Sequence, residues 1–122
     1  PADPSAPPAP LAGLRVDIVS ACQGADPAAI DAAVSAGAHG VVVQAFGSGN
    51  IGVLADGAHR AVEAGVPVVV ASRVASGGVQ LVYGGAGGGR SLARAGVRSG
   101  GELTAAQARM ELLCELAVRR AG

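Results

Sequence analysis

Residues 40–73 read GVVVQAFGSGNIGVLADGAHRAVEAGVPVVVASR, and this stretch decides the fold. It opens with an apolar run at 40–46, continues through a glycine-rich turn at 47–52 and a helical segment to about residue 64, and closes with a second apolar run at 67–73. Continuous valine runs are typical of strands that are buried on both faces of a parallel sheet. A strand, a helix and a second strand in this order predict a βαβ unit.

The residues before this stretch predict another strand and helix. RVDIVSA at 15–21 predicts a strand. Asp26 followed by Pro27 predicts a helix N-cap with proline at the first helical position. This helix is expected to run to about residue 36, where Gly37 can end it in the left-handed conformation.

The residues after the stretch predict a last helix. Residues 74–101 are rich in glycine and predict loops, a short helix at 90–95 and a brief edge strand near 96–99. Thr104 with Gln107 three residues later matches a capping box. The apolar stripe expected on this helix consists of Ala106, Met110, Leu113 and Ala117, widened by Leu112 and Leu116. Glu115 and Arg119 are spaced as an i,i+4 ion pair.

These elements predict an α/β fold, namely a three-layer Rossmann-like domain. Its sheet is expected to be small and mostly parallel, with about four strands flanked by helices. Residues 1–13, PADPSAPPAPLAG, are dominated by proline and alanine and predict an extended linker. The α/β domain is expected to occupy residues 14–122.

Composition excludes several classes of function. The formal net charge is zero and the basic residues, all arginine, are scattered, so no nucleic-acid surface is expected. No run of 18 apolar residues exists, so no membrane-spanning helix is expected. Cys22 and Cys114 are expected to be buried thiols, and no group of side chains has metal-ligand spacing.

The glycine-rich turn carries the clearest local motif, because Gly47, Gly49 and Gly52 fit G-x-G-x-x-G between a strand and a helix. This context permits a small dinucleotide-binding module as one alternative. The turn follows the second strand rather than the first, however, and the turn after the first strand is not a phosphate loop. His39 and His59, the only imidazole bases, are expected at the opposite end of the sheet and in the middle of a helix. A third alternative is an assembly domain without a site.

Three segments in order resemble the C-terminal domain of the L-asparaginases, the bacterial-type asparaginase/glutaminase family. They are GADPAAIDAAVSAGAHGVVVQAFGSGNI (24–51), GVPVVVASRVASGGV (65–79) and LARAGVRSGGELTAAQARMELLCELA (92–117). The similarity covers about residues 14–118. A related possibility is the asparaginase-like subunit of the archaeal glutamyl-tRNA amidotransferase.

The resemblance implies an amidohydrolase that converts asparagine to aspartate and ammonia through a threonine nucleophile, with no cofactor. The nucleophile and its threonine, lysine and aspartate companions would belong to an N-terminal domain. This chain has no lysine, and Thr104 is its only threonine, so it is expected to supply no catalytic residue and to be inactive alone. Asn50 matches the family's asparagine that contacts the active site of a neighbouring subunit, with Ser48, Gly49 and Tyr83 as candidate supporting residues.

The resemblance also implies partners. These are the N-terminal asparaginase domain and a neighbouring subunit in a homo-oligomer, with L-asparagine as the substrate of the full enzyme. Some secreted members add a glutamate after the third strand, but residues 74–101 contain no acidic side chain. The cytoplasm is slightly favoured over the periplasm or secretion.

Overall fold

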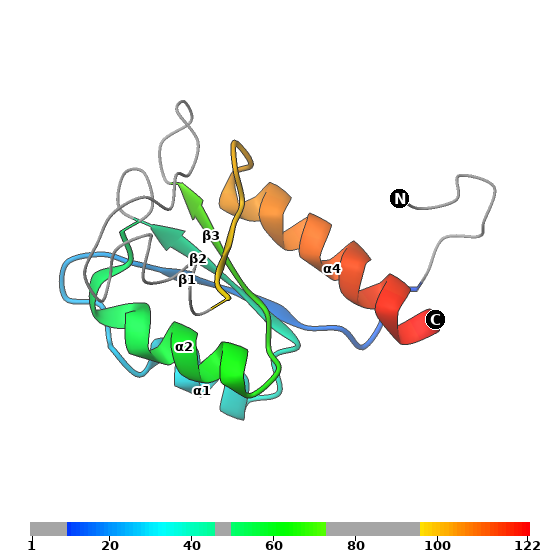
Figure 1. Cartoon of the computed structure of the whole chain (residues 1–122), viewed down its shortest axis with the longest axis horizontal. Helices are drawn as coiled ribbons and strands as arrows, with labels where there is room; N and C mark the ends of the chain where they lie inside the picture. Colours follow the sequence, from blue (N-terminus) through cyan, green and yellow to red (C-terminus); the bar gives the residue numbers. More distant parts are fainter. Residues whose placement is uncertain (1–9, 46–49, 73–95) are drawn as a thin grey trace.

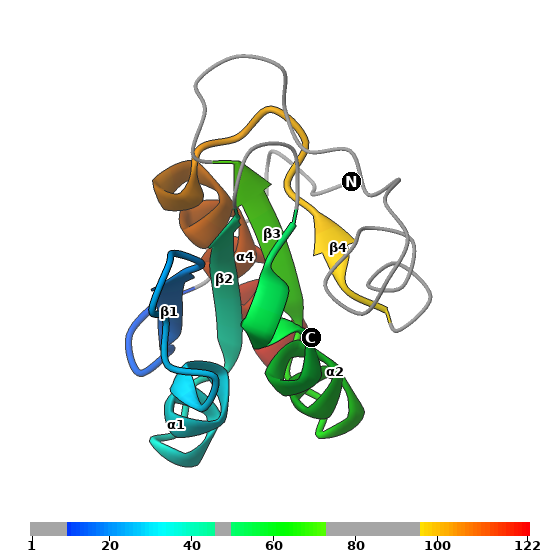
Figure 2. The same cartoon turned by 90° about the vertical axis from the view of Figure 1, so that its left-hand side faces the viewer.

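The computed structural model describes residues 10–45, 50–72 and 96–122, which form one α/β unit (Figure 1). Its strands form a single four-stranded sheet in the order β1-β2-β3-β4, and every neighbouring pair is parallel (Figure 2). The elements in chain order are β1 (Val16–Ser20), α1 (Ala29–Ser35), β2 (Gly40–Ala45), the 3₁₀ turn η1 (Gly52–Leu54), α2 (Ala55–Glu63), β3 (Val68–Ser72), β4 (Arg98–Ser99) and α4 (Ala105–Ala121). The predicted fold class is confirmed.

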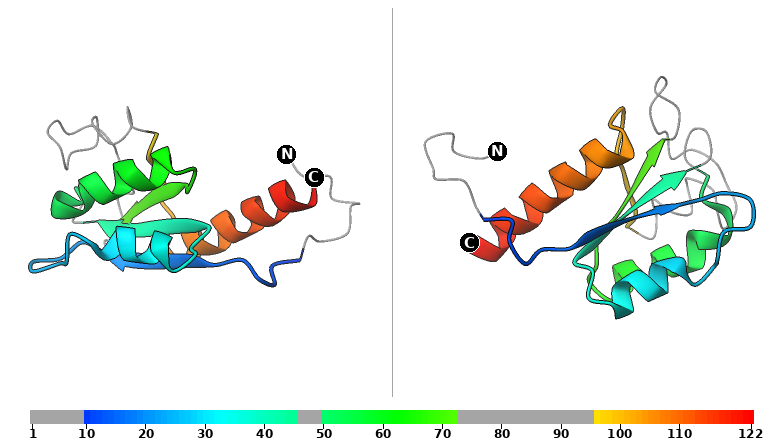
Figure 3. Two further views of the ribbon diagram at one scale, coloured as in Figure 1. Left: turned by 90° about the horizontal axis from the view of Figure 1, so that it is seen from below. Right: turned by 180° about the vertical axis from the view of Figure 1, so that it is seen from behind.

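Helices cover both faces of the sheet, so the unit has three layers (Figure 3). Helices α1 and α2 lie on one face, and α4 lies on the other. The inner strand β2 shows why helices cover both faces, because its successive valines point to opposite faces of the sheet. Val41 and Val43 pack into the α1–α2 core, whereas Val42 packs into the α4 core. The valine run is therefore buried on both faces, as its composition predicts.

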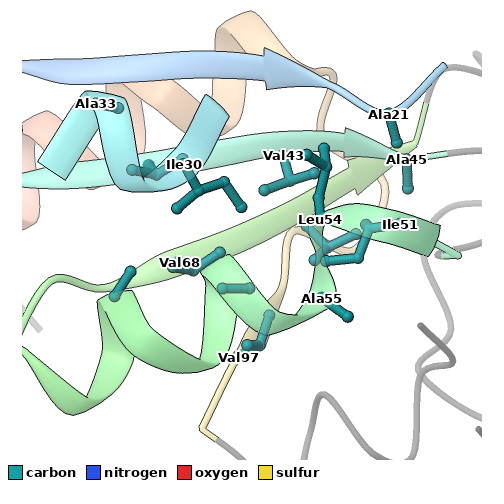
Figure 4. Packing of buried hydrophobic residues seen from close by; sticks show 14 of the residues in the cluster. Ala21, Ile30, Ala33, Val43, Ala45, Ile51, Leu54, Ala55, Val68 and Val97 are labelled. Atoms are coloured by element: carbon teal, nitrogen blue, oxygen red, sulfur yellow. The ribbon is translucent and has the colours of Figure 1, made fainter. Parts of the chain in front are cut away.

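Small aliphatic side chains fill the α1–α2 core (Figure 4). Ile30, Ile51 and Leu54 are its largest fully buried side chains. Burial of each contributes about 1.5–3 kcal/mol relative to exposure. Ile51 and Leu54 belong to the segment directly after Asn50, so their packing holds this segment against the end of the sheet.

Gly37 ends α1 as predicted and Gly65 ends α2 in the same way, but the start of α1 differs from the prediction. Gly37 and Gly65 have φ values of 98° and 85° after α1 and α2. The Asp26 carboxylate accepts a hydrogen bond from the Ala28 amide, and this turn precedes the helix rather than capping it. Helix α1 begins only at Ala29, and no side chain caps it.

The capping box of α4 is confirmed. Thr104 Oγ1 accepts a hydrogen bond from the Gln107 amide, and Gln107 Oε1 accepts one from the Thr104 amide. The predicted stripe was wrong at Ala106 and Met110, which are exposed. Alanine and leucine occur on more than one side of this helix, so the sequence alone allowed more than one choice of buried face. The face that packs on the sheet contains Ala105, Ala108, Leu112, Leu113 and Ala117.

The expectation of buried thiols was also wrong, since Cys22 and Cys114 are both exposed. Cys22 lies in the turn after β1, and Cys114 lies on the outer side of α4. The described part of the predicted linker runs beside the end of α4, where Arg120 Nη2 donates to the Pro10 carbonyl at 2.7 Å. The boundary at residue 13 stays a prediction.

Candidate functional site

The candidate site lies at the carboxyl edge of the sheet, where β1, β2 and β3 end side by side (Figures 1 and 4). This edge is where parallel α/β sheets place their ligands. The turn at residues 21–25 and the segment at residues 51–53 enclose a hollow of about 320 Å³. Its lining is mostly apolar, so polar recognition at this edge depends on the residues around it.

Asn50 stands at the start of this segment and is exposed. Its Oδ1 accepts a hydrogen bond from the backbone amide of Gly52 at 2.9 Å. This bond closes a local turn that leads into η1, and Gly52 has a φ of 55°. Among the described residues, the Nδ2 group of Asn50 has no hydrogen-bond partner. Within the part of the chain that the structure describes, the two Nδ2 hydrogens of Asn50 are thus available to a ligand, while its Oδ1 accepts from the Gly52 amide.

The electrostatic setting of Asn50 suits a negatively charged ligand group. Asn50 lies two residues before η1, which continues into the nine-residue helix α2. The amino end of a helix carries a partial positive charge and attracts anions. A carboxylate at this position would meet both that field and the Nδ2 donors.

A second polar pair lies at the same edge, at the ends of β1 and β2. Ser20 Oγ donates to Gln44 Oε1 at 3.0 Å, and the two residues are neighbours in the parallel register. Sequence reasoning did not single out Gln44. The signal was present, since Gln44 is the polar residue within the run VVVQA.

Several residues predicted for the site lie outside the described residues. They are Ser48, Gly49 and Tyr83, and Gly47 of the glycine motif. Of the dinucleotide fingerprint, only Gly52 is described, and its amide already binds Asn50 Oδ1. This bond weighs against a phosphate at that amide.

The depression of about 400 Å³ between β1 and α1 is larger and more open than the hollow, but its charges are satisfied. Arg15 and Asp17 form an ion pair there, with Nε and Oδ1 2.8 Å apart. The Arg15 hydrogen bond, chiefly, lowers the pKa of the Asp17 carboxyl, although desolvation opposes it. No unpaired charge of this pair remains for a ligand, so we place the candidate site at the carboxyl edge.

The two histidines lie away from the site. His39 precedes β2 at the opposite end of the sheet, and its Nδ1 accepts from the Arg15 amide at 3.0 Å. His59 is in the middle of α2, and its Nε2 is buried without a hydrogen-bond partner among the described residues.

Within residues 10–45, 50–72 and 96–122, no three His, Cys, Asp or Glu side chains gather as a metal site would require. None of the described helices has both the length and the apolar character that crossing a membrane needs.

Comparison with known proteins relates this chain to a protein family. Residues 15–120 match the family described as the glutaminase/asparaginase C-terminal domain. Among solved structures, the chain is similar to a probable cytoplasmic L-asparaginase from Campylobacter jejuni, with a TM-score of 0.72 and 29% sequence identity. The match covers 84% of this chain but only 30% of that one, so the chain spans less than a third of that relative.

Proposed function

This chain belongs to the glutaminase/asparaginase C-terminal domain family, and from this membership we propose that it is the C-terminal domain of an L-asparaginase. The complete enzyme hydrolyses the side-chain amide of L-asparagine to aspartate and ammonia. Support comes from the similarity to a probable cytoplasmic L-asparaginase and from the exposed Asn50 at the carboxyl edge of the sheet.

The role proposed for Asn50 is to bind the substrate. One observation carries it: Oδ1 is held by the Gly52 amide, while Nδ2 has no partner among the described residues. In this proposal the Nδ2 group donates to an oxygen of the substrate carboxylate. A hydrogen bond to a charged group contributes about 1.5–3 kcal/mol.

The bond-breaking residues are proposed to lie outside this chain. Thr104, its only threonine, accepts from the Gln107 amide with Oγ1 and so stabilises the start of α4. The chain also lacks lysine. We therefore assign the nucleophile to a preceding N-terminal domain, and Asn50 to a site that a neighbouring subunit completes. The isolated chain should then be inactive.

Two substitutions of Asn50 separate substrate binding from turn formation. Asn50→Asp keeps an acceptor for the Gly52 amide but replaces the Nδ2 donors by an anionic oxygen. In the complete enzyme, we expect Asn50→Asp to lower kcat/KM for asparagine by about 10–100-fold, because a factor of ten corresponds to about 1.4 kcal/mol. Asn50→Ala removes both groups and should be impaired as well.

The comparison between the two variants decides the matter. Aspartate is a good turn residue, so a purely structural Asn50 would tolerate Asn50→Asp and suffer only from Asn50→Ala. Wild-type kinetics for Asn50→Asp would therefore remove Asn50 from the binding site. Unchanged thermal unfolding of both variants would show that any kinetic effect is local.

Location is a further proposal. The similar Campylobacter jejuni protein is described as a probable cytoplasmic L-asparaginase, and we propose the same compartment for this chain. Fractionation of the source cells, followed by immunodetection, tests it, and recovery outside the cytoplasm would contradict it.

A further inference from the structure

A side chain makes part of the first contact between the backbones of β1 and β2. The register of the two strands begins at Val16 and Gly40, so Arg15 and His39 lie one position before it. The His39 amide donates to the Arg15 carbonyl at 2.7 Å, as the backbone of a neighbouring strand would. In return, the Arg15 amide donates to Nδ1 of the His39 ring at 3.0 Å. The imidazole thus serves as the acceptor that a main-chain carbonyl supplies elsewhere in a sheet.

These two hydrogen bonds hold the end of the segment that precedes β1, residues 10–15. Leu11 and Leu14 of this segment are partly buried against the α4 core. Arg120 of α4 holds the start of the segment by donating to the Pro10 carbonyl. The contact with the histidine ring therefore lies where the predicted linker joins the α/β unit (Figure 1).

A ring nitrogen can accept this hydrogen bond only while it carries no proton. Since Nδ1 of His39 accepts from the Arg15 amide, the proton of the neutral ring is on Nε2. In the charged imidazolium both nitrogens carry protons, and neither can accept. Histidine is the side chain that gains its charge between about pH 5 and pH 8, and His39 is exposed to the solvent that supplies the proton. Protonation of His39 would therefore leave the Arg15 amide without its acceptor.

The groups that β1 and α1 place near His39 are already bonded to Arg15. His39 takes part in none of the four ion pairs of the described residues. Asp17 of β1 accepts from Nε and Nη2 of Arg15 with its two carboxylate oxygens, at 2.8 Å and 2.9 Å. The carboxyl end of a helix attracts cations, but the Ala36 carbonyl at the end of α1 accepts from Arg15 Nη1 at 2.9 Å. Arg15 thus occupies the acceptors that a protonated ring could use on these two elements.

The other two elements at this end of the sheet bring an apolar side chain, a cation and a bonded carbonyl. Helix α4 places Leu116 beside Gly40, and its Arg120 lies at the same end of the sheet. Before β3, the Pro67 carbonyl accepts from the amide of the second residue of β2. None of these contacts supplies a carboxylate, so protonation adds a positive charge beside Arg15 without a new partner for it.

We propose that the contact between Arg15 and His39 is a pH-sensitive switch at the start of β1. At neutral and higher pH, Nδ1 accepts from the Arg15 amide and residues 10–15 are held against the sheet. In acid, the protonated ring releases this amide, while the His39 amide still donates to the Arg15 carbonyl. The change is therefore confined to the segment before β1, and the sheet stays intact. This inference concerns how the linker is held and does not rest on the function proposed above.

Hydrogen–deuterium exchange of the complete protein reports the state of this contact. Mass spectrometry of overlapping peptic peptides that contain Arg15 gives the exchange rate of its amide, and comparison with the intrinsic rate at each pH gives a protection factor. Between about pH 8 and about pH 5, the wild-type protection factor should fall about three- to tenfold, which corresponds to the loss of one hydrogen bond. Peptides that cover Val68–Ser72 of β3 should keep their protection and serve as the internal reference.

Variants of the two histidines assign the change to one ring. His39→Asn places an amide oxygen near the position of Nδ1, and this acceptor does not titrate, so protection should stay near the wild-type value of pH 8 at every pH. His39→Ala offers no acceptor and should give low protection throughout. The matched control, His59→Asn in the middle of α2, should keep the wild-type pH dependence.

Three results would overturn the proposal. They are equal wild-type protection at both pH values, an equal fall in His39→Asn, and full protection in His39→Ala. Asparagine hydrolysis is measured separately, so failure here leaves the proposed function standing.

Discussion

Packing of α4 on the sheet makes a prediction about Gly40 and Leu112, which belong to different elements and meet in the α4 core. Gly40 is buried at the start of β2, and Leu112 of α4 is only 1% exposed. A Cβ atom added at Gly40 would lie 2.7 Å from Leu112 Cδ2 and 3.3 Å from its Cγ. Each of two substitutions, Gly40→Ala and Leu112→Ala, should therefore destabilise the fold for opposite reasons.

The magnitudes follow from the two kinds of misfit. Gly40→Ala overfills the core, because the buried Leu112 side chain has no free space to enter, and this should cost about 1–2 kcal/mol. Leu112→Ala leaves a cavity and should cost about 3 kcal/mol. In the double variant, the new methyl group occupies part of the space that Leu112 leaves. The clash disappears and the cavity shrinks, so the double variant should lose no more than about 3 kcal/mol.

Urea unfolding measures these differences as shifts of the midpoint at constant slope. We expect a coupling free energy of about 1–2 kcal/mol in favour of the double variant. The control combines Leu112→Ala with Gly24→Ala, a site where an added Cβ would contact nothing within 4 Å, and this pair should be additive. Additive losses for Gly40→Ala and Leu112→Ala would refute the packing described for α4.

Two further predictions concern α4. Thr104→Ala removes the Oγ1 acceptor of the Gln107 amide and should lower the free energy of unfolding by about 1 kcal/mol in urea titrations. Thr104→Ser keeps a hydroxyl acceptor and should retain most of the wild-type stability. Equal stability of Thr104→Ala and wild type would argue against the cap. Glu115 has a pKa below its ordinary 4.5, chiefly because Arg98 hydrogen-bonds its carboxylate, with a smaller contribution from Arg119. The contribution of the Glu115 ion pair to stability, about 1 kcal/mol, is thus complete above the ordinary pKa and is lost as the pH falls through the lowered pKa. The difference in unfolding free energy between wild type and Glu115→Gln should therefore shrink from pH 7 toward pH 2. A difference that does not depend on pH would contradict the pairing.

Much of the fold could be predicted because local signals agreed with the tertiary structure. Residues 40–73 specified strand, turn, helix and strand, and the glycines at positions 37 and 65 marked helix ends that need a positive φ. Burial of β2 on both faces followed from its valines alone. These features depend on the spacing of apolar residues and on the backbone conformation of single residues, and the local sequence determines both.

The errors arose where the outcome depended on distant neighbours. The face of α4 was misassigned because alanine and leucine occur on several sides of the helix, and only contact with the sheet decides which side is buried. Cys114 is exposed for the same reason. The Arg98–Glu115 ion pair joins residues 17 positions apart and has no local signature.

The candidate site was predictable in place but not in detail. The position of Asn50 after β2 followed from the chain order, whereas the bond between its Oδ1 and the Gly52 amide needed coordinates. That bond changes the chemistry available, because it occupies one acceptor position of Oδ1 and leaves the Nδ2 donors without a partner among the described residues. The pairing of Ser20 with Gln44 likewise depends on the register of two strands.

Ammonia release from L-asparagine tests the central claim most directly when this 122-residue chain and the complete protein are compared at equal concentration. We expect steady turnover by the complete protein and none by the chain alone, because the role proposed for this chain is to bind one end of the substrate while the nucleophile lies elsewhere. Turnover by the isolated chain would contradict this division of labour, and a folded complete protein inactive on asparagine would contradict the function itself.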